Sequence, residues 1–238
     1  MDSILTISKK ELAGFFESLS GYIVLIAFLG FTGFFTWLYG SDIFIRKQAD
    51  LVVFFSIAKW TLFFFIPAIT MKLISEEKNT GTLELLLTKP LNESQLVIGK
   101  FFAAFFLVAI ALALTLIYYI SISYLGKVDH GAIISGYLGL LLFSAAYIGI
   151  GLFASSISKN QIVAFLLALL IGIFFQIIFD ILGASISGVW GKIFDFLSIS
   201  GHFDSISRGV WDTRDIIYFL SVCILGIQLA KENLVNRK

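Results

Sequence analysis

The stretch from residue 101 to residue 125, FFAAFFLVAIALALTLIYYISISYL, lies in a run of 26 residues without Lys, Arg, Asp or Glu, bounded by Lys100 and Lys127. A helix that crosses a bilayer needs about 20 consecutive, mostly apolar residues. Because hydrocarbon offers the backbone no water, such a segment must pair its own amide and carbonyl groups, as a helix does. The stretch therefore predicts a membrane-spanning α-helix.

The composition of the whole chain agrees with this interpretation. Of its 238 residues, 58% are hydrophobic and 14% are charged, and the mean hydropathy is +0.96. A soluble domain carries about 45–50% apolar and about 25% charged residues, so an ordinary soluble enzyme domain is excluded. The net charge of +1, without a basic stripe, argues against nucleic acid as a partner. A single cysteine, Cys223, excludes a disulfide framework.

Charge-free runs along the chain predict six spans. Two are less regular than the others, because Lys59 interrupts one of them and the last has only 15 residues. We count both, since each would otherwise leave an apolar segment in water. The expected fold class is an all-α polytopic membrane protein, with a single domain over residues 1–238. The spans are expected at residues 21–39, 51–71, 101–125, 132–155, 161–179 and 216–230.

Three segments remain outside these spans. Residues 1–20 place apolar side chains on one helical face, which predicts a helix in the membrane interface; packing against a partner's soluble domain is the alternative. Residues 72–100 form a long loop. Residues 181–214 mix glycines with apolar pairs, and are too broken to span and too apolar for a free loop. We expect short, partly re-entrant helices there, on the outer side of the membrane.

The positive charges outside the spans predict the orientation. The side with both termini and the 72–100 loop carries ten Lys and Arg residues, against six on the other side. Short loops rich in Lys and Arg stay in the cytoplasm. Both termini are therefore expected in the cytoplasm.

Few residues are candidates for chemistry. Neither His130 nor His202 has a second ligand at metal-site spacing, so we expect no metal site and no catalytic residue. The chain also lacks the phosphate-binding sequence Gly-x-x-x-x-Gly-Lys-Ser/Thr. Ionisable groups at membrane depth are functional candidates by default, which singles out Lys59. Its ammonium can face a cavity in the bundle or snorkel to the headgroups, and we favour snorkelling.

The loop after the second expected span reads SEEKNTGTLELLLTKP over residues 75–90. A turn at Gly81 is expected to precede a short helix capped by Thr80 or Thr82. That helix would carry an apolar stripe at helical spacing, made by Leu83, Leu86 and Leu87. A stripe exposed to water needs a partner surface, although the periodicity alone fits equally well with leucines that fold back onto the bilayer.

This loop resembles the signature of ABC-2 type transporter permeases. The residues that carry the resemblance are Glu76, Glu77, Lys78, Gly81, Thr82, Leu83, Glu84, Leu85, Leu86, Leu87, Thr88 and Pro90, followed by Gly99 and Lys100. Six spans, an amphipathic first helix and a re-entrant segment before the last span are also similar to that family. The resemblance implies a permease subunit of an ATP-driven transporter, an exporter by the family's usual direction, and no enzyme activity in this chain.

In that family the loop forms a coupling helix that docks on a separate ATP-binding subunit. The resemblance implies two copies of that subunit, which would bind the ATP and Mg, and a second permease or a second copy of this chain as a membrane partner. It implies ATPase-coupling roles for Glu76, Glu77, Thr80, Gly81, Thr82, Leu83, Glu84, Leu86 and Leu87.

Other segments resemble the gliding-motility permeases of the GldF type from Bacteroidetes. They are residues 10–12, 14–16, 21–24, 66–71, 154–156 and 160–165. This narrower resemblance implies the bacterial inner membrane, a GldA-like ATP-binding partner, a GldG-like second permease and a role in gliding motility.

Other classes of function make different demands on the chain. An ATP-driven scaffold or remodelling subunit that moves no soluble cargo is the alternative, because the sequence shows no polar substrate route. An ion-coupled secondary transporter would need charged span centres and an inverted repeat, and the chain offers Lys59 alone. An intramembrane enzyme would need an acid or His pair at membrane depth, which the sequence lacks.

Overall fold

The computed structural model describes residues 2–38, 48–82 and 92–235, and every regular element in these ranges is a helix. The expected fold class, an all-α polytopic membrane protein, is confirmed. In chain order the elements are α1 (Asp2–Glu17), α2 (Leu19–Trp37), α4 (Val52–Thr80), α6 (Glu93–Leu114), α7 (Leu116–Leu125), α8 (His130–Ile157), α9 (Gln161–Ile173), η1 (Phe174–Ile178), α10 (Phe179–Ser185), α11 (Val189–Leu197), α12 (Ile199–Ser207) and α13 (Thr213–Val235).

Among the described residues, five helical segments are long and apolar enough to cross a membrane. They are Val52–Thr80, Glu93–Leu125, His130–Ile157, Gln161–Ser185 and Thr213–Val235. A sixth arises when α1 and α2, which meet at an angle of 75°, are counted together. The bend separates a charged, amphipathic α1 from an α2 of 19 uncharged residues.

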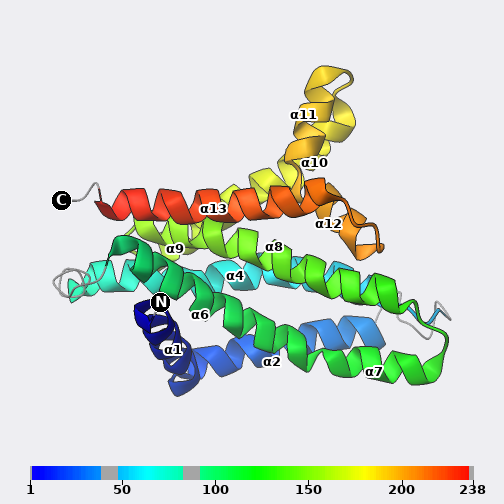
Figure 1. Cartoon of the computed structure of the whole chain (residues 1–238), viewed down its shortest axis with the longest axis horizontal. Helices are drawn as coiled ribbons and strands as arrows, with labels where there is room; N and C mark the ends of the chain where they lie inside the picture. The colour runs from blue at the N-terminus through cyan, green and yellow to red at the C-terminus, as the bar shows by residue number, and fades with distance from the viewer. Residues whose placement is uncertain (1, 39–47, 83–91, 236–238) are drawn as a thin grey trace.

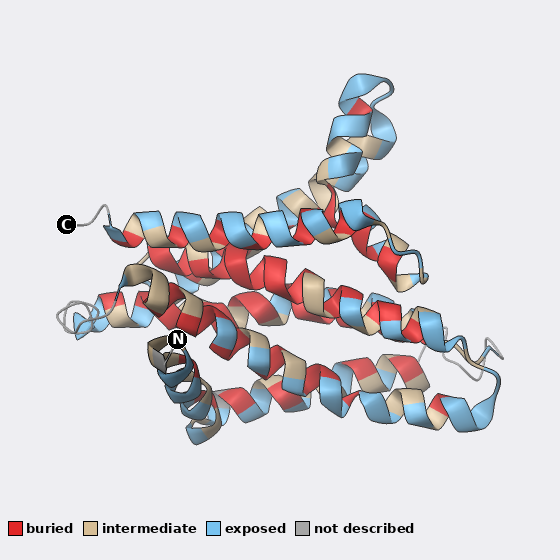
Figure 2. Ribbon diagram, viewed as in Figure 1, coloured by how far each residue is buried: buried red, intermediate tan, exposed pale blue. Residues whose placement is uncertain are grey.

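The long helices run side by side, and α8 lies at the centre of the bundle (Figures 1 and 2). It packs against α4, α9, α12 and α13, and most of its residues are buried. Small residues allow these close approaches. A Cβ added at Gly151 would stand 2.8 Å from the Cβ of Thr70 in α4, and one added at Gly149 would stand 2.8 Å from the Cys223 carbonyl oxygen in α13.

Several helices extend beyond the spans expected from the sequence. The expected loop of residues 72–100 begins and ends as helix, because α4 continues to Thr80 and α6 starts at Glu93. The last span has 23 residues rather than 15, since α13 begins at Thr213 and continues through Lys231 to Val235. Charged residues at a span's end keep the backbone hydrogen bonds of the helix while their head groups reach water.

The segment before the last span forms a lobe that projects sideways from the bundle (Figure 1). The chain leaves α9 through the π-helical turn η1, continues as α10, and reverses at Gly188, whose φ of 88° is in the left-handed region. α10 and α11 form the projecting part, and α12 returns to pack on α8. α11 exposes a group of apolar side chains that includes Val189 and Trp190.

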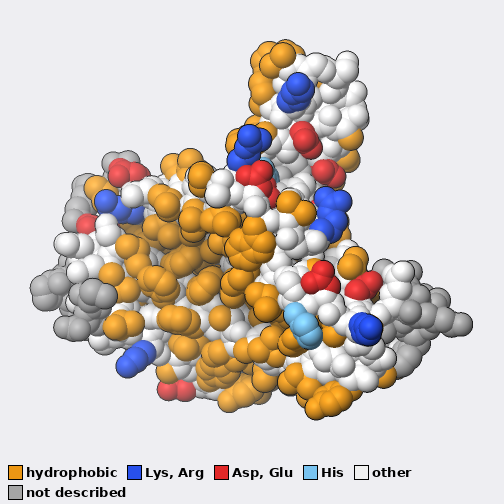
Figure 3. Space-filling view, turned by 45° about the vertical axis from the view of Figure 1, so that its right-hand side comes forward, with side chains coloured by type: hydrophobic (Ala, Val, Ile, Leu, Met, Phe, Trp, Pro, Cys, Tyr) orange, Lys and Arg blue, Asp and Glu red, His pale blue; other side chains and the backbone are white. Residues whose placement is uncertain are grey.

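Different helix ends and connections lie at the two ends of the bundle. α1 and the last turn of α13 lie at the end where α4 finishes and α6 begins, which we call the Thr80 end (Figure 1). α12 and the α7–α8 connection lie toward the opposite end. Figure 3 shows apolar side chains across the middle of one face, with charged side chains near its edges and on the lobe.

Candidate functional site

The residues expected to couple to an ATPase begin at the last turns of α4. Thr80 is the final residue of that helix, and its hydroxyl donates to the Glu76 carbonyl at 2.9 Å and lies 2.9 Å from the Thr82 hydroxyl. Gly81 ends the helix with a φ of 73°, a left-handed conformation that favours glycine. The other expected coupling residues, Leu83, Glu84, Leu86 and Leu87, lie outside the described residues.

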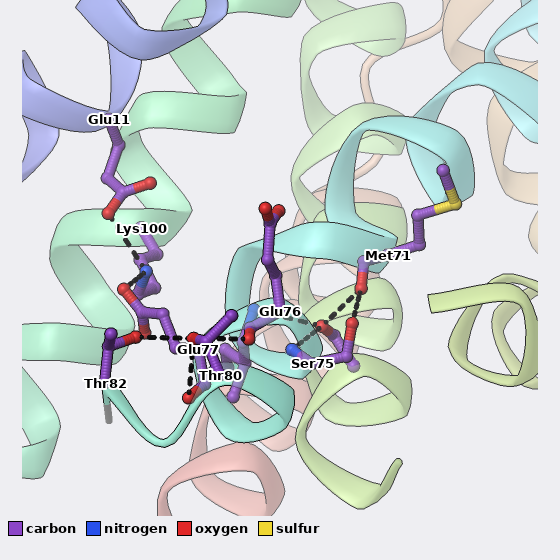
Figure 4. A network of polar contacts seen from close by, with 10 residues as sticks. Glu11, Met71, Ser75, Glu76, Glu77, Thr80, Thr82 and Lys100 are labelled. Atoms are coloured by element: carbon purple, nitrogen blue, oxygen red, sulfur yellow. Dashed lines mark hydrogen bonds and ion pairs between the residues drawn. The ribbon is translucent and has the colours of Figure 1, made fainter. Parts of the chain in front are cut away.

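Three helices meet at the buried ammonium of Lys100, next to this turn. Its Nζ donates to Glu77 Oε1 of α4 at 2.7 Å and to Glu11 Oε1 of α1 at 3.0 Å (Figure 4). Lys100 itself is on α6 and only 1% exposed. We call this arrangement of Glu11, Glu77 and Lys100 the Lys100 node. It joins the amphipathic helix to the two helices that flank the loop.

Glu77 lies beyond the part of α4 that can be in hydrocarbon. α4 has 29 residues, about 43 Å at the rise of an α-helix, whereas the hydrocarbon core is about 30 Å thick. Burial raises the pKa of the Glu77 carboxyl above its usual value, the Lys100 ammonium opposes this, and the Glu11 carboxylate adds to it. Glu77 Oε2 is buried without a hydrogen-bond partner among the described residues. The ionised Glu77 therefore depends on Lys100.

The end of α8 holds α4 and α13 through two serines. Ser155 Oγ accepts hydrogen bonds from the backbone amides of Ile74 at 3.1 Å and Ser75 at 3.0 Å, and donates to the Met71 carbonyl at 2.9 Å. The Ser156 carbonyl accepts from Lys78 Nζ of α4 and from Asn233 Nδ2 of α13. The Thr80 end is thus cross-linked by polar contacts from the first helix to the last.

A cavity of about 440 Å³ opens between α1 and the last turns of α4. Its lining mixes both signs of charge with an apolar wall. The residues are Lys10, Glu11, Gly14, Phe15, Ser18, Lys72, Leu73, Glu76, Glu77, Thr80, Thr82 and Lys100. The Lys72 ammonium lies 4.7 Å from the centroid of the Phe15 ring, which ties α1 to α4 at this wall.

Comparison with known protein families decides what kind of protein carries these features. A family model described as "ABC-2 family transporter protein" matches residues 5–199, which include most of α1, the Thr80 turn and Lys100. The chain belongs to the ABC-2 transporter family. It is therefore a multi-pass membrane permease, a transport subunit that is not itself catalytic, and the family implies association with an ABC ATP-binding subunit. A search of curated proteins finds no match.

Lys59, the ionisable residue expected at membrane depth, is paired within the helix bundle of this ABC-2 permease. Lys59 Nζ donates to Asp204 Oδ1 of α12 at 2.8 Å and to Ser200 Oγ at 3.4 Å, and lies 5.3 Å from the centroid of the Phe203 ring. The Lys59 residue is 6% exposed. The sequence left open whether this ammonium faces a cavity or snorkels to the headgroups, and in the structure it is paired with a carboxylate of the returning helix α12.

The structure does not bring Lys59 and the coupling residues together. Lys59 and Thr80 are in the same helix, 21 residues apart, which corresponds to about 30 Å of helix. The Lys100 node thus lies at the Thr80 end, and the Lys59–Asp204 pair lies toward the opposite end. A movement at one of these sites can therefore reach the other only through the packed helices between them.

Sequence reasoning missed the residues that complete the Thr80 site. Lys100 and Glu11 carried no motif of their own beyond the resemblance, and Ser155 and Ser156 entered the sequence analysis only within the segment 154–156 of the narrower resemblance. The sequence holds no signal for these partners, because the burial of Lys100 and its contact with Glu77 arise only in the folded bundle.

Proposed function

We propose that this permease couples ATP hydrolysis on a separate subunit to a rearrangement of its membrane helices. The observation that carries the proposal is the Lys100 node, in which one buried ammonium holds the end of α4, the start of α6 and the amphipathic α1. The segment between Gly81 and Glu93 connects two of these three helices. A partner that moves this segment therefore moves all three helices together.

The polar contacts at the end of α8 extend this movement across the bundle. Ser155 is bonded to the backbone of α4, and the Ser156 carbonyl accepts from both α4 and α13. Packed interfaces of this kind shift between discrete arrangements rather than deforming gradually. Each nucleotide state of the ATPase would favour one arrangement of the helices, by the difference in its affinity for the two.

The partner surface is proposed to be the segment that follows Gly81. Leu83, Leu86 and Leu87 would be the apolar docking side chains. Glu76 and Glu84 would pair with basic groups on the ATP-binding subunit, whereas Glu77, of which the same was expected, is paired with Lys100 within the chain. ATP and Mg would be held by two copies of that subunit. A second permease, or a second copy of this chain, would complete the membrane part.

The narrower proposal is a permease of the GldF type that serves gliding motility. The segments named in the sequence analysis support it, residues 66–71 and 160–165 among them. The partners would then be a GldA-like ATPase and a GldG-like permease. The protein would lie in the bacterial inner membrane with the Thr80 end and both termini in the cytoplasm, and would work as an exporter.

A second candidate function is ATP-driven remodelling of the membrane or of a membrane protein, without a soluble cargo. One observation favours it. A hollow of about 410 Å³ between α2 and α4 is lined by Phe31, Trp60 and Phe64 among others, and exposes no polar surface. A continuous polar groove where this chain meets a second permease would contradict this candidate.

Purification from native membranes in mild detergent, with mass spectrometry of the bound proteins, tests the coupling proposal. We expect an ABC ATP-binding subunit to co-purify with the wild-type chain and with Leu125→Asp, an exposed leucine away from the Thr80 end. Leu86→Asp should lose the subunit. Gly81→Val should keep membrane insertion but uncouple hydrolysis from function. Absence of an ATPase from the wild-type preparation, or its full retention by Leu86→Asp, would contradict the proposal.

A further inference from the structure

The cavity at the Thr80 end lies between one face of α1 and one face of α4. Its volume of about 440 Å³ is within the range of sites that bind small ligands, about 300–1,000 Å³. Its lining residues recur at every fourth position along both helices, as residues on one helical face do. They are Lys10, Gly14 and Ser18 on α1, and Lys72, Glu76 and Thr80 on α4. Two helices that are far apart in the sequence therefore build one wall each.

The charges in this lining balance. Three lysines and three glutamates line the cavity, and the Lys100 node accounts for one of the lysines and two of the glutamates. The other three charged residues are Lys10, Lys72 and Glu76. A lining with equal numbers of both signs suits a ligand that carries both signs and has no net charge.

The spacing of Lys72 and Glu76 indicates how far apart the two charges of such a ligand are. The residues are four apart on α4, which corresponds to one helical turn and about 6 Å along the axis. The Lys72 ammonium lies 4.7 Å from the centroid of the Phe15 ring of α1, on the side of the cavity to which Lys10 also belongs. An anionic group can thus pair with Lys72 and Lys10 while a cationic group one turn away pairs with Glu76.

The cavity lies at the level of the lipid headgroups. Residues 60–71 of α4 include no charged residue, and Lys72 is the first one after them. From Lys72 to Thr80 the helix rises about 12 Å, and the interfacial layer begins where the hydrocarbon ends. The amphipathic α1 meets α2 at an angle of 75°. Phe15 and Leu73 add apolar surface to the lining, along which an acyl chain can lie.

We propose that this cavity binds the headgroup of phosphatidylethanolamine. The phosphate accepts hydrogen bonds from Lys10 and Lys72, and the primary ammonium donates to the Glu76 carboxylate. The trimethylammonium of phosphatidylcholine has no N–H to donate, and sites for such a group use aromatic faces. Phe15 is the aromatic residue of the lining, and the Lys72 ammonium already lies over its ring. A water-soluble phosphoethanolamine has the same headgroup chemistry, but it has no acyl chain for the apolar surface.

This site goes beyond the proposed coupling function and requires only the membrane-embedded fold. A carboxylate offers about four lone pairs, so Glu76 can accept from the headgroup and also from a basic group of the ATP-binding subunit. A bound headgroup contacts α1 and α4 at once, beside the Lys100 node. The permease without its ATPase is therefore the protein to test, because failure of the coupling proposal would leave the result unaffected.

Native mass spectrometry of the delipidated permease in detergent micelles measures the lipid preference. Phosphatidylethanolamine should bind at least about tenfold more tightly than phosphatidylcholine with the same acyl chains, because a hydrogen bond to a charged group is lost. Glycerophosphoethanolamine, the headgroup without acyl chains, should not displace the lipid at equal concentration. Equal binding of the two lipids, tighter binding of phosphatidylglycerol, or displacement by the soluble headgroup would overturn the proposal.

A variant that fills the cavity locates the binding without changing any charge. A Cβ added at Gly14 meets no atom within 4 Å, so Gly14→Leu should fold and occupy the space that the headgroup needs. It should lose the tightly bound phosphatidylethanolamine. Gly30→Leu, where a Cβ also meets no atom within 4 Å, should keep it. Undiminished binding by Gly14→Leu would show that the lipid binds elsewhere and would refute the site.

Two charge variants separate the roles of the headgroup contacts. Glu76→Gln should bind the two lipids about equally, whereas Glu17→Gln, an exposed acid outside the lining, should keep the preference. Lys72→Gln should weaken the binding of both lipids, because both carry the phosphate, and the exposed Lys9→Gln should not. A preference that persists in Glu76→Gln would contradict the assignment of the ammonium to this carboxylate.

Discussion

Gly149 of α8 and Gly226 of α13 lie with their backbones in contact. A Cβ added at Gly226 would stand 2.9 Å from the Gly149 Cα, and one added at Gly149 would stand 2.8 Å from the Cys223 carbonyl oxygen. In lipid, helices associate through close packing rather than through exclusion of water, and small residues permit backbone contact. Through this contact the last span, α13, packs directly against α8, the central helix of the bundle.

Adding one methyl group at this contact should therefore destabilise the permease. We expect Gly226→Ala to cost about 1–3 kcal/mol, because the two backbones must separate. Gly30→Ala is the matched control, since a Cβ there meets no atom within 4 Å. Unfolding of both variants in mixed micelles measures the difference, and equal stability would show that α8 and α13 are not in backbone contact.

Ser155 should stabilise the Thr80 end through its three hydrogen bonds to α4. Ser155→Ala removes all three, and hydrogen bonds between membrane helices contribute about 0.6 kcal/mol each on average, so a loss of about 1–2 kcal/mol is expected. Ser121→Ala removes a bond within one exposed helix and should change little. If the two variants unfold alike, Ser155 does not hold α4.

Lys59 and Asp204 should behave as a coupled pair. Asp204→Ala leaves a buried ammonium without its carboxylate, and breaking a buried pair costs about 3–5 kcal/mol, less here because the Asp204 side chain is 55% exposed. Adding Lys59→Met should recover part of that loss. A double-mutant cycle on unfolding measures the coupling, and strictly additive effects would mean that the two charges do not interact.

Glu77 should make the stability of the permease depend on pH. Because burial raises its pKa, the folded protein holds this proton more tightly than the unfolded chain does. The stability that this group contributes is therefore lost as the pH rises through the raised pKa. Glu77→Gln should flatten this part of the profile, above the ordinary value of 4.5 for this carboxyl, and should not lower the Tm at neutral pH.

The exposed neighbour Glu76 provides the control for that experiment. Glu76→Gln should leave the pH profile of the melting temperature unchanged, because that residue is exposed. Parallel profiles for the wild-type chain and Glu77→Gln would show that Glu77 is not the titrating group.

The sequence predicted the helical membrane fold because the decisive property, a long charge-free run, is local. Span ends were less well predicted. Residues 72–80 looked like a loop by composition, yet α4 continues through them, since helical hydrogen bonding continues through polar residues once a span is formed. Gly81 was expected at a turn, and its left-handed backbone ends α4 there.

The partners of the charged residues could not be predicted from the sequence. Lys100 and Glu11 are 89 residues apart, and Lys59 and Asp204 are 145 apart. Such pairs are set by which helix faces meet in the folded bundle, and a 3.6-residue period carries no information about that. His202 illustrates the same limit, because its contacts with Asp215 of α13 and with the Phe196 carbonyl of α11 arise only in the folded bundle.

The Lys100 node is the centre of the coupling account, and one measurement tests it most directly. Spin labels at the exposed Leu5 of α1 and Ile162 of α9 report the helix arrangement in nanodiscs that hold the permease with its ATP-binding subunit. We expect the distance to differ between nucleotide-free and ATP–vanadate-trapped states. Lys100→Met should retain the bound ATPase but lose this difference, whereas Lys127→Met, an exposed lysine, should keep it. An undiminished nucleotide-dependent change in Lys100→Met would contradict the account.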